Sequence, residues 1–516
     1  MRRLMLVLGA LAFGVSCDAE LKLPSIFSDG MVLQREQRTP VWGWAGPGAD
    51  VTVSFAGQRR MAKADKAGRF MVRLEKMDAS KELRPLVVSC GTESAEVKDV
   101  LVGEVWLCAG QSNMRMYVDE AKDFDQEKAA ANHPQIRMFV DISSPNIEPQ
   151  SDSRGSWKVC SPETVGKFYA TAYFFGRDIY RELDVPVGLI ACAWGGTCIE
   201  TWTPAASLEK FPSVMASKAE EDAKAKTYDE AAEKVRYAKR LEEWKKRDGQ
   251  ARAEGKKEPR KPRMKKDPHK SENYPGNLFN GRVHPWIPYG IRGAIWYQGE
   301  CNSYAMDRAL LYGDLLENMI LQWRKAWDAE FPFYAVQLPN YKTPQVDPVE
   351  DDPRAFVREG CLKAMKELPK VGMAVTVDIG EIKSNHPKNK QEVGRRLAQQ
   401  ALAKTYGRKI VAGGPIYEAM KKDGDRIVLK FGDAGSGLVA KDGNLKTFAI
   451  AGADRRFVEA QAVIVNDFVV VRSAEVAEPV AVRYAWAINP SECNLFNKEG
   501  FPASPFRTDN WPPIGR

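Results

Sequence analysis

The chain has 516 residues, too many for one hydrophobic core, so three or four modules are expected. Its apolar (44%) and charged (28%) fractions are those of a soluble globular protein. Most of the formal net charge of +8 is located in residues 218–270, which contain nineteen Lys/Arg and twelve Asp/Glu and so carry a net charge of +7. A nucleic-acid enzyme would instead spread basic residues over its binding face. No nucleic-acid partner is therefore expected.

Residues 1–19 have the pattern of a secretory signal peptide. Two basic residues are followed by a short apolar run and then by small residues. The run is too short for a stable transmembrane helix, and no later stretch is long and apolar enough to be one. Cleavage near Ala19 and lipidation at Cys17 both fit, so a lipid anchor stays an open alternative. We expect export to the periplasm, or to the outer membrane or cell surface, of a bacterium.

Residues 20–100 are expected to form an N-terminal β-sandwich, because short alternating runs are separated by Gly/Asp turns. From residue 101 to 412, apolar strands alternate with helical periodicity, which is typical of a doubly wound, mostly parallel sheet. The predicted strands are 101–109, 187–194, 293–297, 333–338 and 373–379, and the predicted helices are 170–183, 309–329, 354–368 and 389–406.

A charged insertion, residues 206–272, interrupts the α/β pattern. Its segment 222–247 is rich in Ala, Glu, Lys and Arg and has only a narrow apolar stripe. We predict a solvated helix, or a helical hairpin, in a loop of the α/β domain; a lid or a contact with an anionic glycan is the alternative. Residues 413–516 return to short strands and turns, so a C-terminal β-rich domain is expected.

The nine cysteines have spacings that resemble neither a small disulfide framework nor a zinc site. Several, such as Cys108 and Cys192, lie in apolar runs, where free buried thiols are usual. No disulfide and no metal site are therefore predicted.

The most informative stretch is Gly110-Gln-Ser-Asn-Met114, which follows the apolar run 105–109. A strand that ends in a glycine turn can present one hydroxyl at the carboxyl edge of an open α/β sheet, where such sheets bind ligands. Ser112 is therefore the candidate nucleophile. Ser and Asn are also common at helix N-termini without any chemistry, so the hypothesis needs partners for Ser112.

A serine nucleophile needs a base, and the chain has only four histidines. His386, in a loop stiffened by Pro387 after the predicted strand 373–379, is expected at the same sheet edge as Ser112 and is the preferred base; His284 is the second candidate. No residue can be assigned as the acid of a Ser-His-acid triad, because neither Asp378 nor Glu381 has a compelling spacing from His386. A backbone carbonyl, such as that of Ser384, is the alternative group for orienting the imidazole.

Oxyanion donors should be backbone N–H groups in a turn, or a positioned amide. Trp194-Gly-Gly-Thr197 and Gln298-Gly-Glu-Cys-Asn302 each follow a predicted strand. The glycines permit close approach of backbone to a ligand, and Asn302 can donate from its side chain.

Together with His386-Pro387, these motifs resemble the four blocks of SGNH-type carbohydrate acetylesterases, and nearly the whole chain is similar to the sialate O-acetylesterase family. The likeness includes Leu23-Pro-Ser-Ile-Phe-Ser-Asp-Gly-Met-Val-Leu-Gln34 near the start and Pro502-Ala-Ser-Pro-Phe-Arg-Thr508 near the end. The resemblance implies a three-layer αβα, flavodoxin-like hydrolase domain with flanking β-sandwich modules. It also implies Ser112 as nucleophile, His386 as base, an oxyanion hole from the N–H groups of Ser112 and Gly196 with Asn302, and no metal or cofactor.

Four further side chains, those of Gln111, Arg115, Gln298 and Glu300, are expected to bind substrate. Relatives often carry Glu where Arg115 stands, so a charge beside the nucleophile is reversed. Many also carry Asp where Ser384 stands, which favours a Ser–His dyad supported by a backbone carbonyl. Ser384 and Asp378 are therefore the candidates for orienting His386.

The implied function is an exported esterase that removes O-acetyl groups from an acetylated sugar or glycan, with sialic acid as the first choice. Arg115 and Arg292 are the candidates for binding its carboxylate. An acetyl-xylan or other plant-polysaccharide esterase is the alternative. A non-catalytic glycan-binding protein is the second hypothesis, which the missing acid near His386 favours. The sequence does not indicate an oligomeric state.

Overall fold

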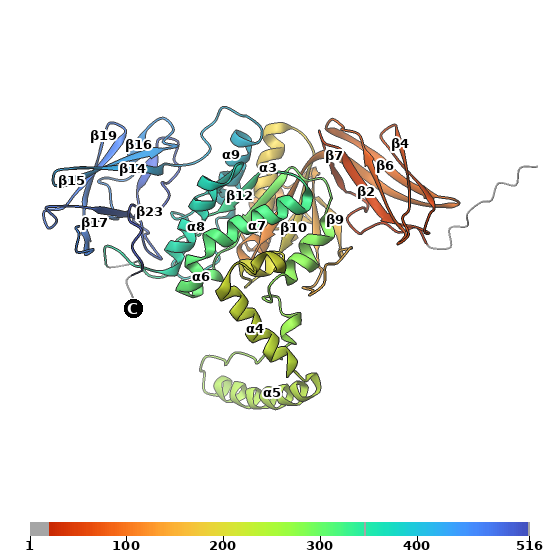
Figure 1. The fold of residues 1–516 in the computed structure, drawn as a ribbon, viewed down its shortest axis with the longest axis horizontal. Coiled ribbons are helices and arrows are strands. Elements are labelled where there is room, and N and C mark those ends of the chain that lie inside the picture. The colour runs from red at the N-terminus through yellow and green to blue at the C-terminus, as the bar shows by residue number, and fades with distance from the viewer. Residues whose placement is uncertain (1–19, 345–346, 514–516) are drawn as a thin grey trace, which may run out of the picture.

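The computed structural model describes residues 20–344 and 347–513. The predicted signal peptide and Cys17 lie outside these ranges. Two β-rich parts flank a central α/β domain, and a pair of helices projects from the centre as an arm (Figure 1). Within the described ranges, no helix is long and apolar enough to cross a membrane.

The N-terminal sandwich forms because its strands alternate buried and exposed residues, as in β5 (Arg69–Leu74), where Phe70, Val72 and Leu74 are buried. β2 pairs with β5 in one sheet, and the other sheet has the order β4-β3-β6-β7 with β1 parallel to β7. The bounds of the other strands are β1 (Val32–Gln34), β2 (Thr39–Trp44), β3 (Asp50–Phe55), β4 (Gln58–Lys63), β6 (Ser80–Cys90) and β7 (Glu93–Gly110).

Strand β7 is longer than the predicted strand 101–109 and belongs to two domains. Its first part pairs antiparallel with β6, from Glu93 opposite Cys90 to Val102 opposite Ser80. Its second part pairs with two strands of the central sheet, as far as Gly110. The strand therefore crosses the predicted domain boundary at residue 100 and joins the sandwich directly to the central sheet.

The central sheet has the strand order β13-β12-β11-β7-β10-β8-β9 and is parallel except for β9. Its further strands are β8 (His133–Asp141), β9 (Gly155–Cys160), β10 (Val187–Ala193), β11 (Gly293–Tyr297), β12 (Phe333–Val336) and β13 (Val371–Ala374). The helices of this domain are α1 (Ser112–Arg115), α2 (Phe124–Ala129), α3 (Ala170–Leu183), α6 (Met306–Leu310), α7 (Tyr312–Trp327), α8 (Pro353–Glu367) and α9 (Lys390–Lys404).

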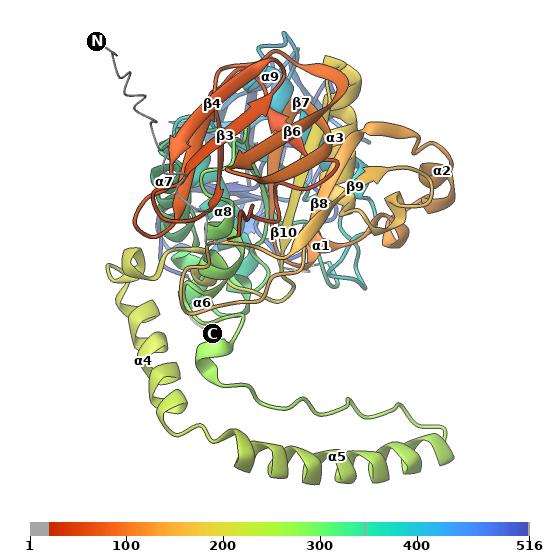
Figure 2. The same cartoon turned by 90° about the vertical axis from the view of Figure 1, so that its right-hand side faces the viewer.

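Helices cover both faces of the central sheet, which gives three layers (Figures 1 and 2). On one face Trp106 of β7 packs edge-to-face against Phe175 of α3. On the other face Trp296 of β11 packs against Trp323 of α7. Since both faces are covered, β10 and β11 are apolar throughout rather than alternating. The predicted three-layer α/β fold with flanking β modules is confirmed.

Individual elements agree with prediction where the periodicity is strong, and α3 and β11 have the predicted bounds. The predicted helix 309–329 is divided into α6 and α7. The predicted strand 373–379 is shifted, because β13 already ends at Ala374. Strands β8 and β9 and the short helices α1 and α2 were not predicted.

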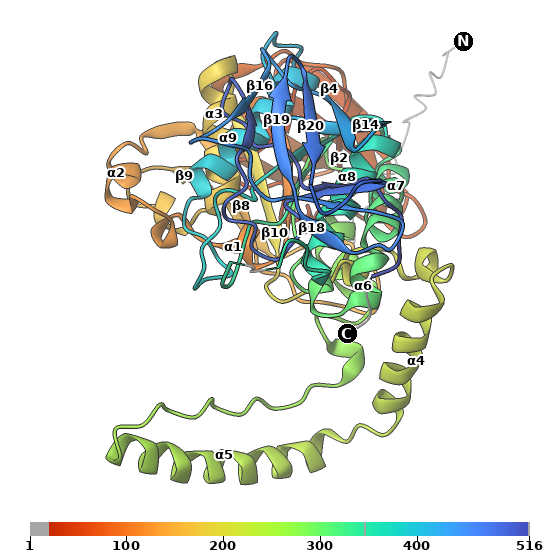
Figure 3. The same ribbon diagram turned by 90° about the vertical axis from the view of Figure 1, so that its left-hand side faces the viewer.

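The charged insertion, for which one solvated helix or a helical hairpin was expected, forms an arm of two helices, α4 (Pro212–Lys226) and α5 (Glu230–Ala253). Asp229 caps α5 by accepting a hydrogen bond from the N–H of Ala232. Figures 2 and 3 show α5 held away from the body, with the returning chain beside it. That chain is joined to α5 by the Trp244 indole N–H, which donates to the Pro259 carbonyl at 2.7 Å.

The C-terminal domain is β-rich, as predicted, and is divided into small antiparallel sheets with the orders β14-β15-β20-β19, β18-β17-β21-β23 and β16-β22. The strands are β14 (Ile416–Asp423), β15 (Arg426–Gly432), β16 (Leu438–Ala440), β17 (Phe448–Ala451), β18 (Phe457–Glu459), β19 (Gln461–Val465), β20 (Phe468–Arg472), β21 (Ala481–Tyr484), β22 (Leu495–Asn497) and β23 (Phe506–Arg507). It is anchored to the α/β domain through buried Arg358 of α8, which donates to the carbonyls of Ala487 and Ile488.

Candidate active site

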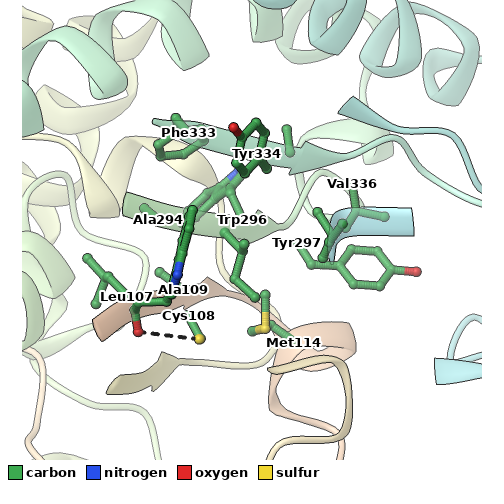
Figure 4. Packing of buried hydrophobic residues seen from close by; sticks show 14 of the residues in the cluster. Leu107, Cys108, Ala109, Met114, Ala294, Trp296, Tyr297, Phe333, Tyr334 and Val336 are labelled. Carbon is green, nitrogen blue, oxygen red and sulfur yellow. Dashed lines mark hydrogen bonds between the residues drawn. The ribbon is translucent and has the colours of Figure 1, made fainter. Parts of the chain in front are cut away.

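Three parallel strands of the central sheet end side by side. Gly110 at the end of β7 is in register with Ala193 at the end of β10 and with Tyr297 at the end of β11. The loops that follow therefore start next to one another, at the carboxyl edge where open α/β sheets bind ligands. Figure 4 shows the buried residues of β7, β11 and β12 that support these strand ends, together with Met114 from α1.

The chain turns at Gly110 because no other residue fits there. Its φ of 142° lies in a region that L-residues avoid, and a Cβ would stand 2.2 Å from the carbonyl oxygen of Tyr297. The next N–H, that of Gln111, donates to the same carbonyl at 3.0 Å. Helix α1 then begins at Ser112, so the hydroxyl is presented at the end of the strand.

The structure brings Ser112 and His386 together although 274 positions separate them. The Ser112 Oγ and the His386 Nε2 lie 2.7 Å apart, within hydrogen-bonding distance. His386 is exposed, so its ring is open to solvent and to a ligand. The other candidate base, His284, instead bonds through Nδ1 with the carbonyl of Gln150 at 2.8 Å.

No carboxylate in the described part of the chain hydrogen-bonds to His386. Asp378 was a candidate for orienting the imidazole. Both of its carboxylate oxygens instead accept hydrogen bonds from the guanidinium of Arg396, at 2.6 and 2.8 Å. Glu381 accepts from the N–H of Lys388. In the described chain the backbone carbonyl of Ser384 does not hydrogen-bond to the imidazole either, and the Ser384 hydroxyl bonds to the backbone N–H and carbonyl of His386. The loop is therefore shaped by backbone contacts.

The Gly195-Gly196 turn lies directly against the nucleophile. A Cβ on Gly195 would stand 3.4 Å from the Cβ of Ser112, and Gly196 has a φ of 73°. Asn273 holds this turn, because its amide donates to the carbonyl of Gly196 and accepts from the N–H of Cys198, both at 2.9 Å. A backbone N–H beside Ser112 is thus held in a fixed loop, as an oxyanion hole requires.

Asn302 is fully buried beside this turn. Its Oδ1 accepts from the N–H of Ile199 at 3.0 Å and from the Gln298 amide at 2.8 Å. Its Nδ2 donates to Glu200 at 3.0 Å. One N–H bond of the amide is used in this way, and the other has no protein acceptor among the described residues. Asn302 can therefore offer one further hydrogen bond.

Three of the four expected substrate-binding side chains are buried and bond within the protein. The Oε1 of Gln111 accepts from the N–H groups of Gly299 and Cys301, both at 3.3 Å. The Gln298 amide donates to the carbonyl of Thr197 at 3.0 Å, and Glu300 is 1% exposed. Through these bonds the three side chains hold the loops of the site together. Of the four, only Arg115 is exposed.

A disulfide joins Cys198 to Cys301, with their Cα atoms 5.0 Å apart. It ties the loop after β10 to the loop after β11 and corrects the prediction that no bridge forms. The signal was present in the strand register, since each cysteine lies four or five residues beyond an aligned strand end. Five other cysteines of the described chain are buried free thiols, namely Cys108, Cys160, Cys192, Cys361 and Cys493.

A buried contact behind the nucleophile was not predicted. The side chain of Asn113 accepts a hydrogen bond from the Nζ of Lys390, the first residue of α9, at 2.5 Å. Burial lowers the pKa of the Lys390 ammonium to about 7, although Glu300 and Glu381 oppose this effect. No pattern in the sequence places a lysine 277 positions away beside Asn113.

Comparison with known proteins settles the family. The family of carbohydrate esterases described as sialic acid-specific acetylesterases matches residues 102–242 and 279–403, which are half of the chain. The chain belongs to this family. It is therefore a carboxylic-ester hydrolase that acts on carbohydrate esters. The unmatched residues between these two segments, 243–278, are the second half of α5 and the returning chain.

Its relatives include enzymes named sialate O-acetylesterase. The mouse enzyme is 28% identical over 95% of both chains, and the human enzyme is 27% identical over 95% of this chain and 93% of its own. A solved structure, a carbohydrate acetylesterase from Xanthomonas citri, is 37% identical with a TM-score of 0.80, and the match covers 95% of this chain and all of that one.

Proposed function

We propose that the protein is an exported sialate O-acetylesterase that works through a serine acetyl-enzyme. The observation that carries the proposal is the 2.7 Å contact between the Ser112 Oγ and the His386 Nε2, beside the Gly195-Gly196 turn. A hydroxyl, an imidazole and backbone donors at one sheet edge are the parts that acyl transfer needs.

In the proposed reaction the Ser112 Oγ attacks the acetyl carbonyl while the His386 Nε2 takes the hydroxyl proton. The N–H groups of Ser112 and Gly196 and the free N–H of Asn302 stabilise the oxyanion. His386 then gives its proton to the leaving sugar oxygen, and the acetyl-enzyme forms. Water, deprotonated by His386, releases acetate and restores Ser112.

The choice of sialic acid rests on the relatives and on one exposed cation. The mouse and human relatives carry that substrate in their names. Arg115 stands three residues from Ser112, is exposed and can reach a ligand carboxylate. Arg292, the other candidate, donates to buried Glu104 at 2.7 Å and precedes β11, so it belongs to the opposite edge of the sheet.

Export is supported by two observations of different kinds. Residues 1–19 have the pattern of a signal peptide. The Cys198–Cys301 disulfide is of the kind that persists in oxidising compartments such as the bacterial periplasm. We propose that the mature chain works outside the cytoplasm, in the periplasm or at the cell surface.

Substitution of the nucleophile tests the chemistry. In Ser112→Ala we expect acetate release to fall by at least roughly 10⁴-fold with an unchanged Tm, because loss of the nucleophile leaves only binding and the oxyanion hole. Acetate release is measured from O-acetylated sialic acid, acetyl-xylan and p-nitrophenyl acetate. The matched control is Ser161→Ala, which removes a hydroxyl from the turn after β9 and should keep full activity.

The outcomes separate the alternatives. Turnover by Ser112→Ala close to that of wild type would remove Ser112 from the mechanism. Wild-type activity confined to acetyl-xylan would replace sialic acid by a neutral polysaccharide. Retention of a glycan without acetate release from any of the three esters would leave a binding protein.

A further inference from the structure

A buried polar cluster lies directly behind the nucleophile, and we call Asn113, Glu300 and Lys390 the Asn113 cluster. Each of the three is at most 1% exposed. They come from α1, from the loop after β11 and from the start of α9. Asn113 bonds to both partners, since its Nδ2 donates to the Glu300 Oε1 at 2.5 Å and its Oδ1 accepts from the Lys390 Nζ at 2.5 Å.

The two charged partners fix the orientation of the Asn113 amide. An ionised carboxylate only accepts hydrogen bonds, and an ammonium only donates them. A flipped amide would place its oxygen against the Glu300 carboxylate and the Asn385 carbonyl, which both only accept, so the flip is excluded. The second N–H of the amide therefore points in one direction, toward the carbonyl of Asn385, and donates to it at 2.9 Å.

This hydrogen bond connects the two members of the proposed dyad. Asn113 is the neighbour of Ser112, and Asn385 is the neighbour of His386. The Asn113 side chain thus joins the nucleophile turn to the histidine loop within a few atoms of the reacting groups. Arg354 holds the same loop from the other side by donating to the Asn385 Oδ1 at 2.6 Å.

We infer that Asn113 is a positioning residue that sets the distance between Ser112 and His386, and that Glu300 and Lys390 together lock its amide for this task. The inference rests on the proposed Ser112–His386 chemistry. It also accounts for the absence of a carboxylate on His386 in the described chain, because the imidazole is positioned through the backbone of its loop.

The composition of the cluster supports a functional role. Burying charged groups costs stability, and neutral residues of similar size are often as good or better for the fold. One Glu300 oxygen, Oε2, is buried without a hydrogen-bond partner in the described chain. The Lys390 Nζ has only Asn113 as a hydrogen-bond acceptor there and lies 5.0 Å from the Tyr297 ring centroid. A cluster built for stability alone would satisfy these atoms.

The first test is Asn113→Asp, which keeps the shape but cannot donate to the Asn385 carbonyl and repels Glu300. We expect kcat/KM on O-acetylated sialic acid to fall on the order of 10²-fold, because small misplacements of a catalytic group have effects of this size. On p-nitrophenyl acetate the loss should be several times smaller, because p-nitrophenolate leaves without the proton that His386 must give to a sugar oxygen.

A second variant covers the case in which Asn113→Asp does not fold. Glu300→Gln with Lys390→Met removes both charges, keeps the volume and lets the Asn113 amide flip. We expect a Tm at or above that of wild type, while kcat/KM on the sugar ester falls roughly ten- to hundredfold. A purely structural cluster would lose activity and Tm together.

The controls separate this inference from the proposed function. Asn318→Asp makes the same change at a buried amide of α7 that donates to Ser207, and it should keep wild-type kcat/KM on both esters. The inference alone would be overturned if Ser112→Ala is inactive while Asn113→Asp folds and keeps wild-type kcat/KM on the sugar ester. Equal losses on both esters would also overturn it, and an active Ser112→Ala would overturn the proposed function.

Discussion

The side chain of Lys390 is buried, and buried positions normally exclude a charged ammonium group. It is fully buried at the start of α9, and an unpaired charge in such a place is costly. Its pKa of about 7, against an ordinary value of 10.5, expresses that cost. The neighbours that favour its charged form are Glu300 and Glu381, while the ring of Tyr297 faces its Nζ.

This pKa makes stability depend on pH. Between pH 7 and 10.5 the unfolded chain binds more protons at Lys390 than the folded chain does, so the free energy of unfolding rises with pH in this window. Below pH 7, where Lys390 is protonated in both states, the destabilisation by its buried charge is fully present. Relative to Glu300→Gln with Lys390→Met, wild type should gain up to about 1 kcal/mol per pH unit from pH 7 to 9 in urea unfolding. A difference that does not change with pH would contradict the assigned pKa.

The residues of the candidate site were predictable to different degrees. Ser112 and His386 stand in motifs at strand ends, and short motifs are visible in one sequence. Asp378 could not be placed, because its partner Arg396 comes from a helix that packs over it only in the folded chain. Gln111, Gln298 and Glu300 belong to the same motifs as the reactive groups, and sequence position does not distinguish a side chain that faces a ligand from one that holds a loop.

At the scale of elements, the register of β7, β10 and β11 assembles the site. Their aligned ends bring three loops together, and the Cys198–Cys301 disulfide then fixes two of them to each other. Strong periodicity made the long helices and the apolar strands predictable. The short helix α1 and the early end of β13 were not, because tertiary contacts, and not local patterns, decide where such elements stop.

The disulfide should contribute to both stability and turnover. Cys198→Ser with Cys301→Ser is expected to lower the free energy of unfolding by about 2–4 kcal/mol, because the bridge closes a long loop in the unfolded chain. Acetate release should fall as well, since both loops border Ser112. Dithiothreitol should lower the Tm of wild type but not of this variant. An unchanged wild-type Tm in reductant would mean that the bridge is absent or without effect.

At the scale of the molecule, the arm is the part least tied to the rest. Only Glu233 and Asp248 of α5 are buried, and Glu233 is covered by the returning chain, whose Lys265 N–H donates to it at 3.0 Å. The arm reaches out from the side of the molecule where α1 lies (Figures 2 and 3).

Removal of the outer arm should leave the chemistry intact. If a short Gly/Ser linker replaces residues 228–266, α4 keeps its contact with the end of the insertion, where His269 bonds to Asp222 at 2.9 Å. We expect wild-type kcat/KM on p-nitrophenyl acetate and a Tm within a few degrees, because α5 packs on the returning chain. A large loss of kcat/KM on this small ester would make the arm part of the active site.

The long strand β7 also decides how the protein can be divided. A cut at residue 100 would break this continuous strand between its two ladders and would separate β1, in the first fragment, from its partner residues 101–103 in the second. Because one strand belongs to both sheets and β1 pairs with its residues 101–103, heat or denaturant should melt sandwich and hydrolase as one cooperative unit. Any evolutionary exchange of the N-terminal module for another would have to carry the nucleophile's own strand with it.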